Sequence, residues 1–184
     1  DDGLQHHALA RSFEIAMIDG DRGLGNGRLL PAGPLRQPPA RLEQVDAIVY
    51  RGYPATSTAI YSGFEFQLEP RAIRRLSDGE ESEPSALSGR AVTAVCGIGN
   101  PAQFVATLER LGASVKLRAF ADHHPLSPKD LNAIPRPILM TSKDAVKLQP
   151  HHALDPEIYV LDVTAALPEA LLQSVIAHVQ QFRS

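Results

Sequence analysis

The sequence contains little cysteine, little net charge and no long apolar run. Its one cysteine, Cys96, rules out a disulfide framework and suits a reducing compartment. The formal net charge of −3 argues against a nucleic-acid partner, because such proteins carry a clear basic excess or stripe. No apolar run approaches the ~20 residues that cross a bilayer, and no signal-peptide pattern precedes the body of the chain. Any membrane contact is therefore expected to be peripheral or to be made elsewhere.

The 184 residues are enough for one domain of moderate size or for two small lobes. The chain begins at Asp1 without an initiator methionine, although residues 1–6 have the character of a loop that follows a buried strand. We therefore expect this sequence to be a piece of a longer protein. Cys96 ends the apolar run 91–96, so we expect a buried core thiol rather than a catalytic nucleophile.

Short apolar runs and turn signals divide the first part of the chain. Residues 13–19 and 46–50 predict parallel strands, and residues 57–69 alternate as a β-hairpin would, with a turn at Ser62-Gly63. Residues 77–89 are rich in Ser, Glu, Gly and Pro and are typical of a linker. We therefore predict a core lobe at 1–56, a hairpin and linker at 57–89, and a C-terminal α/β lobe at 90–184.

The second part of the chain repeats a strand–helix order. The expected strands are 92–96, 114–120, 138–141 and 158–163, and the expected helices are 102–111, 128–132 and 168–182. This alternation predicts an α/β fold with a parallel sheet covered on both faces. In such a fold, ligands bind at the carboxyl ends of the strands.

Glycine and proline crowd the segment 25–36 too closely for regular structure. Glycine lets the backbone approach a bound group, proline stiffens the path, and Arg28 and Arg36 supply fixed cations suited to phosphate. The segment therefore predicts an anion-binding loop. The alternative is an ordinary surface loop with two solvated arginines.

Three further motifs stand at turns where strands are expected to end. Residues 97–100, Gly-Ile-Gly-Asn, either bind phosphate or only turn tightly, and they lack the lysine and hydroxyl of a P-loop. Residues 122–124, Asp-His-His, can orient a base, bind a metal or position a nucleophile, and the alternative is a pair of surface imidazoles. Adjacent extended residues point to opposite sides, so we expect only one histidine to face a site. Asp1 and Asp2 are compatible either with Mg²⁺ held through water or with a solvated end.

Together these motifs resemble the tetraacyldisaccharide 4'-kinases, the lipid A kinases of Gram-negative bacteria. The motifs are DDGLQH at 1–6, IDG at 18–20 with GNG at 25–27 and LPAGPLR at 30–36, CGIGNP at 96–101, DHH at 122–124 and TSKD at 141–144. The resemblance implies a three-layer, parallel-sheet α/β fragment of P-loop NTPase type, with a β-hairpin linker and a C-terminal α/β lobe. It also implies transfer of the ATP γ-phosphate to the 4'-hydroxyl of tetraacyldisaccharide 1-phosphate, by a parent enzyme of which this fragment alone is inactive.

The resemblance also implies roles for particular residues. Asp1 and Asp2 would belong to the Mg²⁺ site, and the cofactors would be ATP and Mg²⁺. The substrate-binding residues would be Gln5, His6, Asn26 and Arg36, with Arg36 on an anionic group of the lipid. The catalytic residues would be His123, as part of a dyad with an aspartate outside this sequence, and Asp122, which orients it. The partners would be the lipid A disaccharide precursor, ATP and the inner-membrane surface, with the enzyme peripheral on the cytoplasmic face and no nucleic acid bound.

The chain departs from the family pattern in several places. Family members begin with an apolar amphipathic segment, a Walker A loop and the acid expected to act as general base, and this sequence contains none of these. Gln37 stands where the family usually has glutamate, and Ser142 replaces the glutamate of the usual Thr-Glu-Lys-Asp. We expect these two changes to weaken local polar contacts without removing the named roles.

Two other functions stay open from the sequence. Residues 122–124 also match the signature of the DHH phosphoesterases, which bind Mn²⁺ through several separated aspartates and histidines. The other acids of that site are not at convincing spacings here, and the glycine-rich trailing motif is missing. A non-catalytic substrate-binding lobe is the third possibility, because a kinase fragment without its P-loop should be inert.

Overall fold

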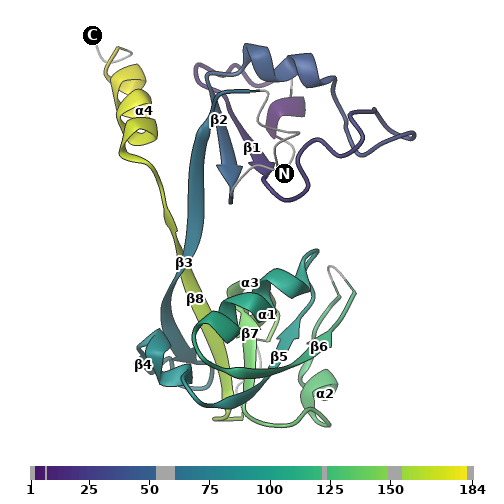
Figure 1. Ribbon diagram of the computed structural model, residues 1–184, viewed down its shortest axis with the longest axis vertical. Helices are drawn as coiled ribbons and strands as arrows, with labels where there is room; N and C mark the ends of the chain where they lie inside the picture. The colour runs from purple at the N-terminus through teal and green to yellow at the C-terminus, as the bar shows by residue number, and fades with distance from the viewer. Residues whose placement is uncertain (1–2, 7, 53–60, 122–123, 149–154, 182–184) are drawn as a thin grey trace. The chain divides into compact units, whose positions relative to one another are not determined.

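The computed structural model describes residues 3–6, 8–52, 61–121, 124–148 and 155–181 (Figure 1). The chain forms two compact units. Unit 1 contains residues 1–68 and 165–184, and unit 2 contains residues 69–164. The long strand β3, Phe64–Arg75, begins in unit 1 and continues into unit 2.

Unit 1 is built on parallel strands. β1, Ile15–Asp19, pairs with β2, Ala47–Arg51, and β2 pairs with the first residues of β3. The other elements of the unit are the short 3₁₀ helices η1 (Gly3–Gln5) and η2 (Pro39–Gln44) and the helix α4 (Glu169–Gln181).

Apolar side chains from β2 and its neighbours cover both faces of this small sheet. One cluster joins Val49 and Phe66 to Leu171 of α4, and the other joins Ile18 and Ile48 to Leu42 of η2. The sheet is therefore enclosed between α4 on one face and η2 with its preceding loop on the other.

Unit 2 contains the rest of β3 and the part of the sheet with the strand order β3-β8-β7-β5-β6. β4 forms an antiparallel pair with β3. β5 is parallel to β6 and β7, and β7 is parallel to β8. The bounds of its elements are β4 Glu81–Ser82, η3 Pro84–Leu87, β5 Ala91–Cys96, α1 Pro101–Arg110, β6 Ser114–Ala119, α2 Pro128–Leu131, β7 Ile138–Thr141, α3 Ser142–Ala145 and β8 Ile158–Ala166.

Helices cover both faces of the unit 2 sheet. Phe104 and Leu108 of α1 pack on one face, and Leu131 of α2 and Ala145 of α3 pack on the other. The run of β5 is buried from its second residue to its last, as expected for a strand covered on both sides. The α/β fold class with a mostly parallel sheet, which the sequence predicted, is thus confirmed.

Local signals at α1 agree with the prediction. The Asn100 side chain accepts a hydrogen bond from the backbone of Gln103 (3.3 Å), Pro101 opens the helix, and Gly112 follows its end at φ +86°. A capping amide, an N-terminal proline and a glycine in the left-handed region are the standard boundaries of a helix.

Two segments differ from the expectation. Residues 64–75 form one strand, and the turn that leads back into the antiparallel strand β4 lies at 76–80, almost entirely within the predicted linker at 77–89. Residues 57–60 of the predicted hairpin lie outside the described residues. Phe64 and Phe66 both pack in the unit 1 core, and the hairpin itself stays a prediction because its first arm falls mostly on residues outside the described ranges. The helix expected at 168–182 packs in unit 1 through Leu171, whereas the sequence grouped it with 90–184. The predicted limits at residues 56 and 89 remain a prediction.

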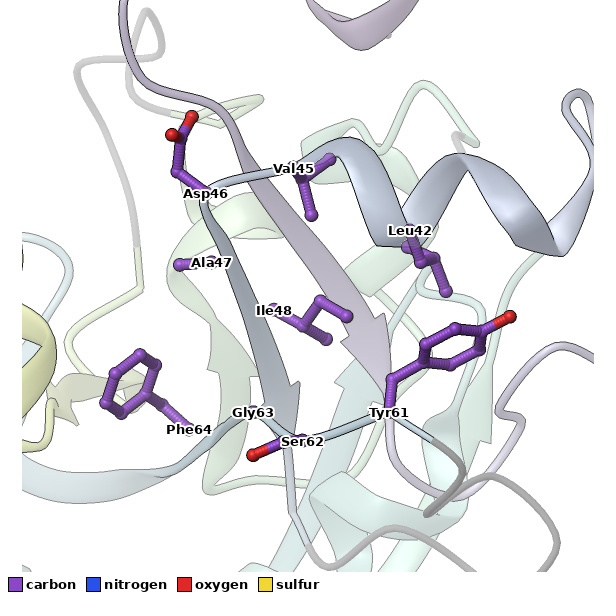
Figure 2. A pocket seen from close by; sticks show the side chains of 9 residues that line it. All are labelled: Leu42, Val45, Asp46, Ala47, Ile48, Tyr61, Ser62, Gly63 and Phe64. Atoms are coloured by element: carbon purple, nitrogen blue, oxygen red, sulfur yellow. The ribbon is translucent and has the colours of Figure 1, made fainter.

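A hollow of about 280 Å³ lies at the amino ends of β2 and β3. In Figure 2, Leu42, Ile48 and Tyr61 gather on one side of β2, while Phe64 lies on the other side. Ligands of parallel sheets bind at the opposite, carboxyl end of the strands. This hollow is therefore a packing feature rather than a candidate ligand site, and Gly63 is one of the residues that line it.

Gly63 is a point of close approach in unit 1. A Cβ added there would lie 2.7 Å from the carbonyl oxygen of Ile48 and 2.8 Å from Cε2 of Tyr50. The Tyr50 hydroxyl also donates to the carbonyl of Tyr61 (3.0 Å), so the ring cannot move without losing that bond.

Gly63→Ala should therefore lower the free energy of unfolding of unit 1 by about 1–3 kcal/mol through overpacking. Urea unfolding followed by circular dichroism measures this. Gly3→Ala is the matched control, because a Cβ at Gly3 meets nothing within 4 Å. Equal stability of the two variants would show that the strand has room at Gly63.

Candidate functional site

The carboxyl ends of three parallel strands meet in unit 2. Cys96 of β5 stands opposite Ala119 of β6, and the preceding residue of β5 stands opposite Met140 of β7. The segments that follow these strands, which carry the motifs at 97–100, 122–124 and 141–144, therefore leave the sheet at one edge.

Asp144 is the central polar group at this edge and is 0% exposed. Its Oδ2 accepts hydrogen bonds from the backbone N–H of Gly97 (3.1 Å) and the Thr141 hydroxyl (2.8 Å). Its Oδ1 accepts from Lys147 Nζ (2.9 Å). The carboxylate thus connects the turn after β5 to the end of β7, and a buried charge of this kind requires such partners.

Gly97 makes room for the segment that precedes the candidate catalytic pair. A Cβ at Gly97 would lie 3.1 Å from the carbonyl oxygen of Ala121 and 3.8 Å from Cβ of His124. The N–H of Gly97 donates to Asp144, and Asn100 is used as the cap of α1. These contacts favour the interpretation of 97–100 as a tight turn over that of a phosphate cradle, because the Gly97 N–H already faces a carboxylate.

His124 follows the candidate catalytic pair at 122–123. Its ring stacks on Phe120 with the centroids 4.8 Å apart, and Nε2 lies 3.6 Å from Oδ2 of Asp130. Within the described ranges, Nε2 is buried and makes no hydrogen bond. Hydrogen bonds from Ser127, with a smaller contribution from His124, hold the pKa of Asp130 below its ordinary value. Asp122 and His123 lie outside the described residues, so the choice of His123 as the inward-facing imidazole stays a prediction.

Cys96 stands beside this site without a reactive thiol. The residue is 0% exposed, and burial, followed by the charge of Asp144, raises the pKa of its thiol to about 11. Since the thiolate is the nucleophilic form, Cys96 stays protonated at neutral pH. The prediction of a core cysteine is confirmed.

The glycine–proline loop of unit 1 closes on itself. The Asn26 amide donates to the carbonyl of Ala32 (2.9 Å), and its Oδ1 accepts from the N–H of Arg28 (3.1 Å). A Cβ at Gly33 would clash with the backbone carbonyl of Arg28 and with Asn26 Oδ1, so only glycine fits there. Asn26 therefore has a role in shaping the loop that the sequence did not indicate, and its contact with substrate stays a prediction.

Arg28 and Arg36 lie on the exposed side of this loop. At the end of β1, Asp19 Oδ2 accepts from Arg51 (3.1 Å), and its Oδ1 accepts from the N–H groups of Asp21 and Arg22. Unit 1 thus presents exposed arginines on a closed loop that follows β1 in the chain. This arrangement is suited to an anionic ligand.

Gln5 and His6 are placed by η1. Gln5 is partly buried at the end of that turn, and His6, directly after it, is exposed. Asp1 and Asp2 lie outside the described residues. Within the described ranges, no group of three or more His, Cys, Asp or Glu side chains could hold a metal ion. None of the helices in those ranges is long and apolar enough to cross a membrane.

Comparison with known proteins connects this arrangement to one family. The family LpxK, tetraacyldisaccharide-1-P 4'-kinase, matches residues 1–180. This chain belongs to that family. The tetraacyldisaccharide 4'-kinase of Legionella pneumophila strain Lens is 42% identical over 180 residues, which are 98% of this chain and 53% of that protein. The kinase of Chromobacterium violaceum is 44% identical over an alignment of 188 positions, which covers 98% of this chain and 55% of that protein.

A solved structure agrees with the family assignment. The crystal structure of the "apo" form of LpxK from Aquifex aeolicus in complex with ATP has a TM-score of 0.66 and 27% identity, over 96% of this chain and 56% of that chain. The fold class of the LpxK kinases is therefore shown. The chain spans about half the length of the curated relatives that it matches.

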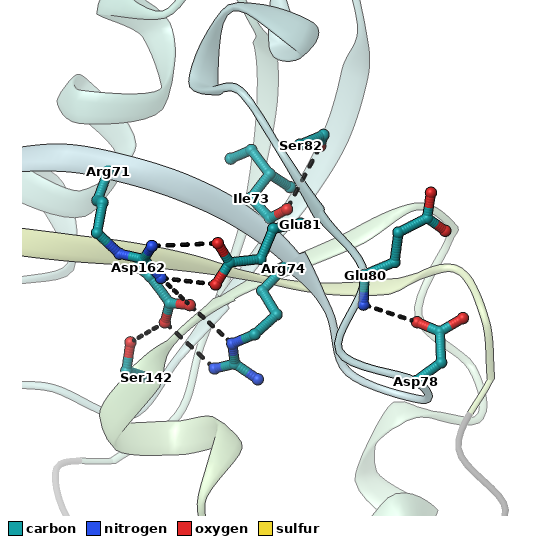
Figure 3. Close-up of polar contacts among 9 residues, drawn as sticks. All are labelled: Arg71, Ile73, Arg74, Asp78, Glu80, Glu81, Ser82, Ser142 and Asp162. Atoms are coloured by element: carbon teal, nitrogen blue, oxygen red, sulfur yellow. Dashed lines mark hydrogen bonds and ion pairs between the residues drawn. The ribbon is translucent and has the colours of Figure 1, made fainter.

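Ser142, where this chain departs from the family's usual glutamate, has a defined partner. Its hydroxyl donates to Oδ1 of Asp162 (2.9 Å), which also accepts from Arg74, with Nε 2.7 Å from Oδ2 (Figure 3). The Arg74 bonds, more than Ser142, hold the pKa of Asp162 below its ordinary value. A glutamate at position 142 would bring a second carboxylate toward Asp162, so serine here fits an ionised neighbour.

The buried carboxylate of Asp144 provides a direct test of this geometry. Asp144→Ala leaves the Gly97 N–H, the Thr141 hydroxyl and the Lys147 ammonium without their shared acceptor. We expect a loss of roughly 3–5 kcal/mol in the free energy of unfolding of unit 2, measured by urea titration.

Glu81→Ala serves as the control for Asp144→Ala. Glu81 pairs with Arg71 (2.7 Å), but its side chain is 45% exposed and water screens the pair, so the loss should be far smaller than for Asp144→Ala. A similar small loss for both variants would mean that Asp144 is not the link between β5 and β7.

Proposed function

We propose that this chain supplies the acceptor side of a kinase that transfers the γ-phosphate of ATP to the 4'-hydroxyl of tetraacyldisaccharide 1-phosphate, a lipid A precursor. The observation that carries the proposal is the family match over residues 1–180, which includes all the motif residues. The exposed arginines on a closed loop can bind the phosphate of such a substrate, and the strand ends of unit 2 hold the segment that carries the candidate catalytic residues. The DHH phosphoesterase alternative is not favoured, because the family match extends far beyond residues 122–124.

ATP and the lipid acceptor bind to different parts of the full-length kinase. This sequence contains no Gly-Lys-Ser or Gly-Lys-Thr, the end of the loop that cradles nucleotide phosphates. We therefore assign ATP binding to the half of the family's length that this chain does not match. Asp1 and Asp2 supply the carboxylate oxygens that Mg²⁺ prefers, and Mg²⁺ neutralises charge on the transferring phosphate when it is bound.

The residues after β6 are assigned to proton transfer. A sugar hydroxyl that attacks ATP needs a base within hydrogen-bond reach, and we assign His123 to that apparatus, with Asp122 as the group that orients its ring. The described flanks support this role, since Ala121 lies against Gly97 and His124 is stacked on Phe120. A segment anchored on both sides can hold a base at a fixed position.

The acceptor is assigned to unit 1. Arg36 faces solvent on the closed loop and supplies a guanidinium for the 1-phosphate, and Gln5 and His6 face the substrate from the η1 turn. Because the acceptor carries four acyl chains, the enzyme must reach it at a membrane surface. We place the parent enzyme peripherally on the cytoplasmic face of the inner membrane.

Arg36→Ala tests the acceptor assignment in a full-length kinase of the family that carries these residues. A charge-assisted bond to phosphate is worth about 1.5–3 kcal/mol, so kcat/KM for the disaccharide should fall roughly ten- to a hundred-fold. Arg36→Lys should restore only part of the loss, because an ammonium cannot bind phosphate in two places.

A disaccharide without its 1-phosphate is the control acceptor, on which wild type and Arg36→Ala should perform alike. Equal impairment on both acceptors would place Arg36 on ATP or on the loop itself. A wild-type enzyme that phosphorylates neither acceptor would overturn the proposed function.

A further inference from the structure

Arg11 binds both ends of the η1 turn. Its Nη1 donates to the carbonyl oxygens of Gly3 (2.9 Å) and His6 (2.8 Å). The same carbonyls accept the turn's own bonds, from the N–H of His6 to Gly3 and from the N–H of Leu9 to His6 (both 3.1 Å). The guanidinium therefore fixes the backbone on either side of Gln5.

Glu14 anchors this guanidinium at the start of β1. Its Oε1 accepts from Arg11 Nε (2.6 Å), and its Oε2 accepts from Arg41 Nη2 (2.5 Å). Its backbone N–H donates to Oδ2 of Asp46 (2.7 Å), directly before β2. The three charged side chains are 15–21% exposed, so water screens them only in part.

The second arginine of this cluster belongs to another part of the candidate acceptor site. Arg41 lies in η2, which begins at Pro39, three residues after Arg36. One carboxylate therefore connects the turn that carries Gln5 and His6 to the helix that follows the Arg36 loop. The bonds from Arg41 and then Arg11 hold the pKa of Glu14 below its ordinary value, so the connecting charge is present at neutral pH.

We propose that Arg11 is a positioning residue for the phosphate acceptor, which sets the Gln5–His6 turn against the Arg36 loop through Glu14 and Arg41. The inference rests on the proposed function, because it concerns residues assigned to the acceptor. Arg11 acts through the fold, since its Nε donates to the Glu14 carboxylate and its Nη1 to two backbone carbonyls. Displacement of a substrate-contacting group by about 1 Å can lower a rate about 10²-fold.

Steady-state kinetics of the full-length kinase test the inference. Arg11→Ala should lower kcat/KM for the disaccharide by about 10²-fold and leave KM for ATP unchanged, because only the acceptor side is displaced. Arg11→Lys keeps the charge but not the planar fork of donors, so it should recover only a small part. Glu14→Gln, which removes the connecting charge, should act in the same direction.

Arg71→Lys is the matched control variant. Arg71 also pairs with a carboxylate, on Glu81 at 2.7 Å, but it lies in unit 2, and the partners described for it are Glu81 and Asp162. Its kinetics should match wild type. If Arg11→Ala raises KM for both substrates alike, or if Arg11→Lys equals wild type, the positioning role is wrong.

Hydrogen exchange in the 184-residue chain supplies a readout that needs no activity. In Arg11→Ala, the amides of His6 and Leu9 should exchange at least about tenfold faster, while those of β5 stay unchanged. Unchanged exchange at His6 and Leu9 would show that Arg11 does not hold the η1 turn. A wild-type enzyme that lacks activity would overturn the proposed function, and the exchange result would still decide whether Arg11 holds the turn.

Discussion

The buried carboxylate of Asp144 is the interaction on which the candidate site of unit 2 depends. It joins the turn after β5 to the end of β7, and the same turn contacts the backbone at Ala121, just before the Asp-His-His motif. Parallel strands bring such segments to one edge, but the sheet alone does not fix the loops that follow. A carboxylate with 0% exposure holds them, because moving either segment away would remove one of its buried hydrogen-bond partners.

Unit 1 uses a related device at lower burial. Glu14 holds Arg11, which binds the η1 turn, and Arg41 of η2, and Asn26 closes the loop between β1 and η2 through two hydrogen bonds. In both units, a polar side chain within the fold holds segments that carry exposed functional groups. This arrangement explains why the motifs contain residues, such as Gly33 and Gly97, that touch no substrate in the proposed mechanism but allow the backbone segments to approach closely.

Local sequence signals predicted the elements that depend on local physics. The apolar runs at 91–96 and 138–141 are strands, and Asn100 and Gly112 bound α1 as their conformational preferences indicate. The sequence did not reveal that 64–75 is one strand, because its alternation fits a hairpin equally well. It also did not reveal Asp144 or Arg11, because their partners are distant or are backbone groups. The Asp144–Gly97 bond, for example, joins residues 47 positions apart, and no pattern along the chain records it.

The hydrogen exchange rate of the Gly97 amide tests the central claim, that Asp144 holds the turn after β5, most directly. We predict that in the wild-type 184-residue chain this amide is protected as strongly as the amides inside β5, and that Asp144→Ala removes the protection at Gly97 before it affects the strand. A wild-type Gly97 amide that exchanges as fast as one exposed to water would show that Asp144 does not hold this turn.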